Sequence, residues 1–171
     1  MLPVFTTTRA PYVVAACLAA VMATSASAAA QPDKPLPEVN VVAVGGVSAP
    51  LGSFATEGQW LIFYMGSPTS SASARLLDAM SKWDIGDRLS RVLVVAGQSG
   101  DPKALAEKWA EQLPGVRWVG DPKNEMAKAL NVRGAPTLLG AKGQTVNWRM
   151  AGVLNDPTML RDIVKSWTGQ Q

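Results

Sequence analysis

Two short, nearly uninterrupted apolar runs limit this chain to a small set of folds. WLIFYM, residues 60–65, and RVLVVA, residues 91–96, are each of strand length, and residues at helical spacing follow both runs. A strand that is apolar along its whole length is covered on both faces, as the central strands of a layered sheet are. We therefore expect an α/β fold with a central mixed β-sheet flanked by helices.

Three Asp-Pro pairs indicate where helices begin. Aspartate accepts hydrogen bonds from the free N–H groups of a first helical turn, and proline lacks only an N–H that would be unpaired there. The pairs are Asp101-Pro102, Asp121-Pro122 and Asp156-Pro157. Apolar residues at helical spacing follow each pair and predict one buried face per helix: Leu105, Trp109 and Leu113; Met126, Ala129 and Leu130; Leu160, Ile163, Val164 and Trp167.

Shorter patterns supply the remaining elements. They predict strands at 41–44 and 116–119, a helix at 70–83, and a final hairpin of 137–139 and 145–149 around Lys142-Gly143. The predicted order is two strands, helix, strand, helix, strand, helix, two strands and a last helix. This alternation supports one sheet between helical layers.

Residues 1–28 have the features of a secretory signal peptide. Arg9 precedes an apolar stretch from Tyr12 to Met22, and Ala26-Ser27-Ala28 has the small-x-small pattern of a signal peptidase site. We expect cleavage near Ala28 and a periplasmic or secreted protein. The apolar stretch is too short to span a bilayer, so no stable membrane span is expected after cleavage. A retained membrane anchor is the alternative.

The single cysteine of the chain lies inside this segment and leaves another possibility open. Val14-Ala15-Ala16-Cys17 loosely matches the site at which bacterial lipoproteins are cleaved and acylated, although few apolar residues precede Cys17. If cleavage follows Ala28 instead, the mature protein has no cysteine and therefore no disulfide to stabilise it.

Residues 29–38 are predicted to be a linker, and residues 39–171 to be one folded domain. QPDKPLPE, residues 31–38, is polar and proline-rich, and the remaining chain is long enough for one hydrophobic core. The chain carries a net charge of +3 and its basic residues form no run. A nucleic-acid partner is therefore not expected.

NVRGAPT, residues 131–137, resembles the loop of the thioredoxin-like superfamily in which a proline is held cis. A glycine-containing turn and a terminal helix follow it, as in that superfamily. The chain is most similar to periplasmic thioredoxins and redoxins of the cytochrome-maturation type, whose extra N-terminal β-hairpin residues 41–51 would supply. The resemblance covers residues 39–168 and implies a thioredoxin-like fold with a cis bond before Pro136. A trans proline at an edge strand is the alternative.

The chain departs from this family at the start of the helix after residues 60–65. Thioredoxins carry a C-x-x-C motif there, and the helix N-terminus lowers the pKa of the first thiol. One register places Ser67 and Ser70 over the two cysteines, and a second register places Ser70 and Ser73 there. The degenerate region comprises Gly66, Ser67, Pro68, Thr69, Ser70 and Ser73.

Hydroxyl groups cannot replace these thiols. Serine forms no disulfide, and its hydroxyl is not a nucleophile without a nearby base. The chain has no histidine, and Asp78 and Lys82 are predicted to lie more than two turns along the helix. Thiol–disulfide oxidoreductase and peroxidase activities are therefore not expected of the mature chain.

No metal site and no cofactor are predicted. Copper chaperones of this fold use cysteines and a histidine, whereas the soft side chains available here are methionines, which are typical of hydrophobic cores. They are Met65, Met80, Met126, Met150 and Met159. Trp83, Trp109 and Trp167 fall on apolar helix faces and are expected in the core as well.

Binding without chemistry is the function that the resemblance favours. In the family, the residue before the cis-proline offers its backbone N–H and C=O to an extended peptide. Ala135 would hold that position, and Arg133, Gly134 and Pro136 would form the groove together with residues 66–70. The expected partner is an extended peptide or a periplasmic protein, as for the cysteine-free assembly factors of this superfamily.

Two other functions remain open. The chain could be a non-thiol accessory subunit of a periplasmic thiol–disulfide or cytochrome-maturation system, in which another chain supplies the cysteines. Alternatively, Ser67, Thr69, Ser70 and Ser71 could bind a small anion, because free N–H groups and the helix dipole favour negative charge at a helix N-terminus. Simple helix capping explains the same residues.

Overall fold

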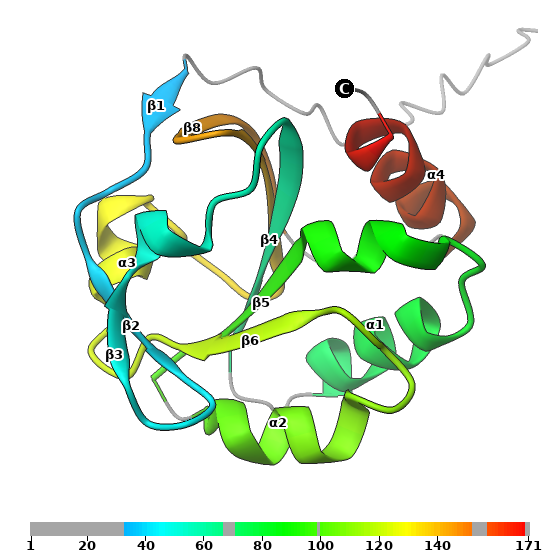
Figure 1. The fold of residues 1–171 in the computed structure, drawn as a ribbon, viewed down its shortest axis with the longest axis horizontal. Helices are drawn as coiled ribbons and strands as arrows, with labels where there is room; N and C mark the ends of the chain where they lie inside the picture. The colour runs from blue at the N-terminus through cyan, green and yellow to red at the C-terminus, as the bar shows by residue number, and fades with distance from the viewer. Residues whose placement is uncertain (1–32, 67–70, 99, 152–156, 170–171) are drawn as a thin grey trace, which may run out of the picture.

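The computed structural model describes residues 33–66, 71–98, 100–151 and 157–169. Within them, eight strands form one mixed sheet in the order β1-β8-β7-β4-β5-β6-β2-β3 (Figure 1). The strands are β1 Lys34–Pro35, β2 Asn40–Ala43, β3 Ser48–Pro50, β4 Gln59–Met65, β5 Val92–Ala96, β6 Arg117–Gly120, β7 Thr137–Lys142 and β8 Thr145–Ala151. The α-helices are α1 Ser71–Ser81, α2 Pro102–Trp109, α3 Glu125–Ala129 and α4 Pro157–Thr168. Two 3-10 helices are η1 Leu51–Phe54 and η2 Gly86–Arg91.

The two apolar runs form the central strands β4 and β5, as predicted. β4 pairs in parallel with β5, which aligns Tyr64 with Val95, and antiparallel with β7, which aligns Tyr64 with Thr137. Every residue from Trp60 to Met65 is at most 5% exposed, because strands flank both edges of β4 and other elements cover both of its faces. The predicted α/β fold class is confirmed.

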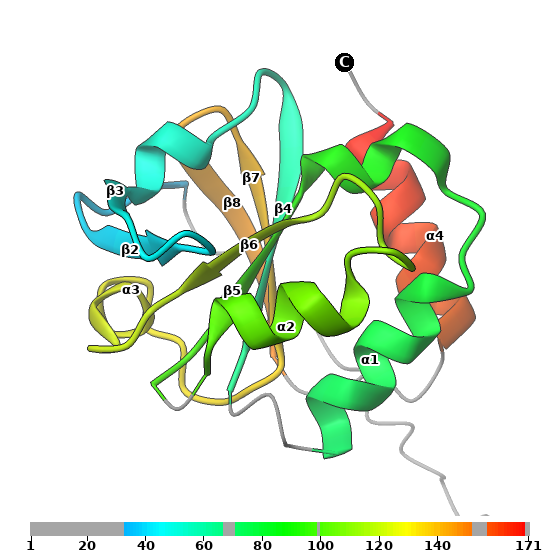
Figure 2. The ribbon, with the colours of Figure 1, turned by 60° about the horizontal axis from the view of Figure 1, so that its bottom comes forward.

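Alternate residues of β4 point to opposite faces of the sheet. Phe63 and Met65 pack in one apolar cluster with residues of α1, α2 and α4. Ile62 and Tyr64 pack in a second cluster with residues of α3 and η1. Figure 2 shows the resulting layers, with α1 and α4 on one side of the sheet and α3 on the other. Tyr64 therefore points from the centre of the sheet toward α3.

The Asp101-Pro102 pair starts a helix as predicted. Pro102 is the first residue of α2, and the Asp101 side chain accepts a 2.8 Å hydrogen bond from the backbone N–H of Lys103. Leu105 and Trp109 are buried as expected. Leu113 is buried too, although α2 ends at Trp109 and Leu113 lies in the turn that follows.

The prediction for the Asp121-Pro122 pair is wrong. α3 begins only at Glu125, and the residue before it, Asn124, is in the left-handed conformation with φ of 54°. Asp121 is buried and 1% exposed, and its carboxylate accepts from the N–H groups of Met126 and Ala127 in the delayed helix, not from the residues that directly follow it. The shift also changes the buried face of α3, where Ala127 is buried and Ala129 is only partly buried.

The third pair begins with Asp156, which lies outside the described residues. α4 starts at Pro157, the position that the pattern predicts for the first helical residue. Leu160 and Val164 are buried, and Ile163 and Trp167 pack against the same core while partly exposed.

Part of the predicted linker belongs to the sheet. Lys34 and Pro35 form β1 and pair antiparallel with Val146 and Thr145 of β8. Leu36 is 9% exposed and packs in the cluster on the α3 side of the sheet. The fold therefore begins before residue 39, because this short segment completes one edge of the sheet.

The expected N-terminal hairpin is present. β2 and β3 pair antiparallel, with Val41 opposite Ala49, and Gly46 turns the chain between them with a φ of 78°. Within the parts of the chain that the structure describes, no helix has the length and apolar character needed to cross a membrane. The predicted signal peptide, residues 1–28, and Cys17 lie outside the described residues.

Candidate functional site

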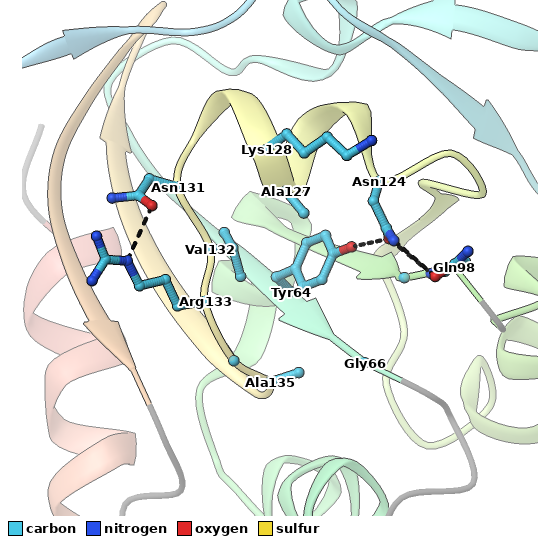
Figure 3. Close-up of a pocket in the computed structure, with 12 residues that line it drawn as sticks. Tyr64, Gly66, Gln98, Asn124, Ala127, Lys128, Asn131, Val132, Arg133 and Ala135 are labelled. Atoms are coloured by element: carbon cyan, nitrogen blue, oxygen red, sulfur yellow. Dashed lines mark hydrogen bonds between the residues drawn. The ribbon is translucent and has the colours of Figure 1, made fainter.

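A pocket of about 590 Å³ lies between the C-terminal end of β4, α3 and the loop before β7 (Figure 3). Tyr64 contributes to it from β4, and Gly97 and Gln98 contribute from the loop after β5. The remaining wall comes from α3 and the proline loop: Asn124, Ala127, Lys128, Asn131, Val132, Arg133, Gly134 and Ala135, with Gly66 at the end of β4. Three segments that are distant in sequence thus meet at one end of the sheet.

The hydroxyl of Tyr64 lies at the inner end of this pocket and contacts two side chains. Its oxygen is 3.3 Å from Oδ2 of Asp121 and 3.1 Å from Oδ1 of Asn124, which are both acceptors for the single hydrogen of the hydroxyl. A Cβ at position 97 would stand 2.9 Å from this hydroxyl. Gly97 therefore leaves the space that the tyrosine needs.

Asp121 holds α3 against the sheet. Its carboxylate accepts hydrogen bonds from the backbone N–H groups of Met126, at 3.3 Å, and Ala127, at 3.0 Å. The backbone N–H of Asp121 donates to the carbonyl of Ala96 at the end of β5, at 2.7 Å. A buried carboxylate needs several donors to offset its lost hydration, and here α3 and Tyr64 supply them.

Burial raises the pKa of Tyr64 well above its ordinary value, and the nearby carboxylate of Asp121 raises it further. Both effects oppose formation of a phenolate. Tyr64 therefore stays a neutral hydrogen-bond donor across the physiological pH range, and it is not poised to act as a base.

Asn124 and Gln98 connect α3 to the loop after β5. The Asn124 side chain accepts from the backbone N–H of Gln98 at 3.2 Å and donates to Oε1 of Gln98 at 3.0 Å. Figure 3 shows this pair beside the Tyr64 hydroxyl. The side-chain oxygens of both amides are thus occupied by donors from within the protein.

The predicted groove residues lie together on the opposite wall. The peptide bond between Ala135 and Pro136 is cis; Pro136 is buried, and Arg133, Gly134 and Ala135 are exposed. The hydroxyl of Thr137 donates to the carbonyl of Gly134 and closes the loop on itself. Across the described segments, the backbone N–H and C=O of Ala135 have no hydrogen-bond partner.

The serine region is described only in part. Ser67, Pro68, Thr69 and Ser70 lie outside the described residues, so the structure tests neither the two registers nor the anion site. Gly66 is described and lies beside Ala135, since a Cβ added to Gly66 would be 2.9 Å from the Ala135 Cβ. Ser73 is in the first turn of α1 and is fully buried.

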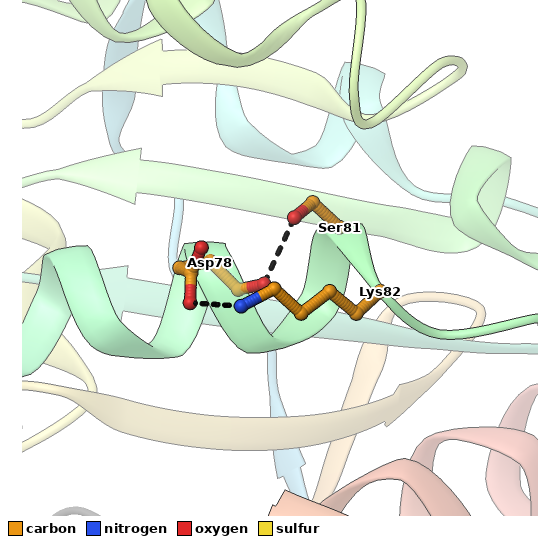
Figure 4. A network of polar contacts seen from close by, with 3 residues as sticks. All are labelled: Asp78, Ser81 and Lys82. Atoms are coloured by element: carbon orange, nitrogen blue, oxygen red, sulfur yellow. Dashed lines mark hydrogen bonds and ion pairs between the residues drawn. The ribbon is translucent and has the colours of Figure 1, made fainter.

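An ion pair joins Asp78 of α1 to Lys82, the residue that follows the helix. The two exposed side chains are 2.7 Å apart, and the Ser81 hydroxyl donates to the carbonyl of Asp78 (Figure 4). Both residues lie away from the start of α1, as predicted from the sequence. Neither residue can serve as a base at the start of the helix.

Three of the methionines lie in the core, as predicted: Met65, Met80 and Met126 are fully buried. Met150 is partly exposed against the core, and Met159 is 51% exposed. Among the residues that the structure describes, no group of three His, Cys, Asp or Glu side chains is placed to hold a metal ion.

The sequence analysis missed the polar side chains of this pocket. Tyr64 is the only residue with a hydroxyl group in the apolar run 60–65, and a buried tyrosine hydroxyl usually has a hydrogen-bond partner. That rule points to a polar neighbour on the α3 side, although it does not identify Asp121 or Asn124. Lys128 also lines the pocket, and no comparable pattern in the sequence predicts its position there.

The described residues that line the pocket present hydrogen-bonding groups and positive charge. Among them there is no cysteine, serine, threonine or carboxylate. The pocket offers a free backbone edge at Ala135, amide side chains, and the cations of Lys128 and Arg133.

Comparison with known proteins yields similarity in structure alone. No known family profile matches the sequence, and no curated protein matches it. Solved structures do resemble it, at low sequence identity.

A candidate thiol:disulfide interchange protein, DsbE, from Chlorobium tepidum is 16% identical, with a TM-score of 0.58 over 82% of this chain and 99% of its own. A secreted Mycobacterium tuberculosis disulfide oxidoreductase homologous to E. coli DsbE is 10% identical, with a TM-score of 0.57 over 75% and 96%. Peroxiredoxin 5 from Alvinella pompejana is 14% identical, with a TM-score of 0.58 over 82% and 99%. The chain therefore has the thioredoxin-like fold shared by these proteins, and it builds that fold with a single cysteine.

Proposed function

We propose that this chain is an exported, redox-inactive thioredoxin-like protein that binds an extended peptide, or an extended segment of a periplasmic protein. The peptide would pair with the backbone of Ala135. The observation that carries this proposal is the backbone of Ala135, exposed at the rim of a pocket, whose N–H and C=O have no hydrogen-bond partner among the described residues. Backbone pairing of this kind gives affinity without any reacting side chain.

The absence of redox chemistry follows from the residues present. The chain has one cysteine, Cys17, and no histidine, so it cannot close a disulfide within itself. Tyr64, the titratable group at the inner end of the pocket, is held in its neutral form by burial and by Asp121.

Export is supported by the sequence of residues 1–28, with its apolar stretch and its small-x-small site before Ala29. One protein of the same fold, the Mycobacterium tuberculosis oxidoreductase, is secreted. An intact mass beginning near Ala29, on protein recovered from a bacterial periplasm, is the expected result. A mass with acyl chains on Cys17 would establish a lipoprotein instead.

Amide hydrogen exchange tests the binding mode directly. Peptides selected from a random displayed library would be added to the purified protein, and exchange of the Ala135 N–H would be followed by NMR. Strand addition predicts that this N–H becomes protected, and that N-methylation of the paired peptide residue abolishes both the protection and the binding. Binding that leaves Ala135 unprotected would refute the groove as the binding surface.

An insulin-reduction assay with dithiothreitol tests the redox prediction. We expect no acceleration over the uncatalysed rate, because no thiol lies in residues 18–171. A cysteine-containing thioredoxin serves as the positive control, and turnover by the pure protein would contradict the proposal.

A further inference from the structure

We infer that the pocket beside Ala135 selects an acidic peptide, by accepting a glutamate or aspartate side chain next to the residue that pairs with Ala135. This inference rests on the proposed function and adds the chemical class of the partner. The inference rests on which hydrogen-bonding groups of the pocket have partners within the protein and which have none.

Each side-chain amide oxygen of the pocket already accepts a hydrogen bond from within the protein. Oδ1 of Asn124 accepts from Tyr64 and from the backbone N–H of Gln98. Oε1 of Gln98 accepts from Asn124, and Oδ1 of Asn131 accepts from Nε of Arg133 at 3.3 Å. Only one lone pair on each of the last two oxygens is left for a donor of a ligand.

The side-chain groups of the pocket that have no partner are donors. In the described part of the chain, Nζ of Lys128 and the two terminal nitrogens of Arg133 have no hydrogen-bond or ion-pair partner. The side-chain nitrogens of Gln98 and Asn131 also have capacity, since the structure uses only one hydrogen bond from an amide nitrogen here, that of Asn124. A carboxylate, which only accepts hydrogen bonds, is complementary to such a set.

The charge of the pocket points the same way. Lys128 and Arg133 line it, and no carboxylate does. In Figure 3, Lys128 extends above the Tyr64 ring toward Asn124, and Arg133 lies to the left beside Asn131, beyond Val132. The nearest carboxylate, Asp121, is buried behind the Tyr64 hydroxyl and is held by the N–H groups of α3.

Two neighbouring cations extend this positive surface. Arg149 of β8 donates to the backbone carbonyl of Asn131 at 2.5 Å, and Lys34 of β1 donates to that of Ala129 at 2.5 Å. Both side chains bind backbone carbonyls at the C-terminal end of α3 or just beyond it, a common role for cations at that end of a helix. Lys128 and Arg133 are the two cations that this role leaves available to a ligand.

The pocket adjoins the groove, so one peptide can reach both. Gly66 and Ala135 line the pocket as well as the predicted groove. A peptide strand places alternate side chains on the same face, so a residue close to the one paired with Ala135 would project over the space between Lys128 and Arg133.

The test compares two capped peptides of valine and alanine that differ only in one central residue, glutamate or glutamine. Fluorescence anisotropy at low salt should give five- to tenfold tighter binding of the glutamate peptide, the range expected of about two exposed charge pairs. Higher salt should reduce this preference, because salt screens exposed charges. Lys128→Ala and Arg133→Ala should each reduce it as well, whereas Lys128→Arg should retain it.

Lys142→Ala is the matched control, because Lys142 is exposed at the opposite end of β7 from Ala135. The preference of this variant for the glutamate peptide should equal that of the unchanged protein.

Equal binding of the two peptides would overturn the acidic selectivity, as would failure of both to bind. If Ala135 is protected equally by both peptides, the proposed function stands. If the glutamate peptide binds equally well after N-methylation, the pocket selects carboxylates but strand addition is refuted.

Discussion

The Cβ of Ala135 stands 2.9 Å from the position that a Cβ on Gly66 would occupy. Real Cβ atoms essentially never lie this close to another heavy atom, so the missing side chain at position 66 lets the end of β4 approach the proline loop. This contact sets the distance between two sides of the groove. It also makes position 66 a place where one methyl group changes the geometry of the site.

Replacing Gly66 by alanine should push the proline loop away from β4. We expect the free energy of unfolding to fall by about 1–3 kcal/mol, the usual cost of overpacking, and peptide affinity to fall with it. Urea denaturation and anisotropy would measure the two effects. Gly134→Ala, in the same loop, is the control, because a Cβ there would meet no atom within 4 Å; a loss of stability equal to that of Gly66→Ala would contradict this prediction.

Asp121→Asn should destabilise the protein by about 1–3 kcal/mol, because an amide cannot accept all the hydrogen bonds that the carboxylate receives from Tyr64, Met126 and Ala127. The measurement is the midpoint and slope of urea unfolding. The matched control is Asp101→Asn, because asparagine caps a helix as well as aspartate does. If the two variants are equally stable, the buried network does not hold α3 in place.

Alkaline titration should show Tyr64 as a late-ionising tyrosine in the exported protein, because the other tyrosine of the chain, Tyr12, lies in the predicted signal peptide. Folding raises the pKa of Tyr64 above its unfolded value of about 10, so its contribution to stability is complete below that pH and is lost as the pH rises further. Tyrosinate absorbance of protein that begins near Ala29 should therefore appear only as the protein unfolds, and Tyr64→Phe should remove it. Titration at about pH 10 in the folded protein would show that Tyr64 ionises normally.

Gly140 and Trp148 face each other across β7 and β8, and a Cβ at position 140 would lie 2.1 Å from the indole ring. The ring of Trp148 also makes an edge contact with Trp167, with ring centroids 5.4 Å apart. Gly140→Ala should displace the indole, lower stability by about 1–3 kcal/mol or more, and change tryptophan fluorescence. Gly45→Ala is the control, since it meets no atom within 4 Å; unchanged fluorescence in Gly140→Ala would contradict the contact.

The sheet could be predicted because its central strands have a clear sequence pattern. The runs at 60–65 and 91–96 are apolar at the positions that face either side of the sheet, and a strand of this kind is buried only inside a layered sheet. The starts of the helices were harder to predict, because the same Asp-Pro pair can cap a helix or form part of a turn. Asp101 caps the helix that follows it directly, whereas the buried Asp121 is followed by a turn and accepts from N–H groups further along, in α3. The local sequence does not encode that difference.

The proline loop of the site could be predicted from NVRGAPT, because this stretch resembles the cis-proline loop of the thioredoxin-like superfamily. The pocket beside it could not. Tyr64, Gln98, Asn124 and Lys128 come from β4, the loop after β5, and α3 with its preceding turn. Only the order of strands brings them together, and no spacing in the sequence records that order.

The reciprocal hydrogen bonds between Gln98 and Asn124 have a consequence for the thermodynamics of binding. They fix two sides of the pocket relative to each other before any ligand arrives, so these side chains have little rotational freedom left to lose. A ligand that enters there bears a smaller entropic cost than it would in a pocket that it had to assemble. Breaking this pair, by Asn124→Ala, should therefore make the entropy of association more unfavourable in calorimetry, even for a ligand that never touches Asn124.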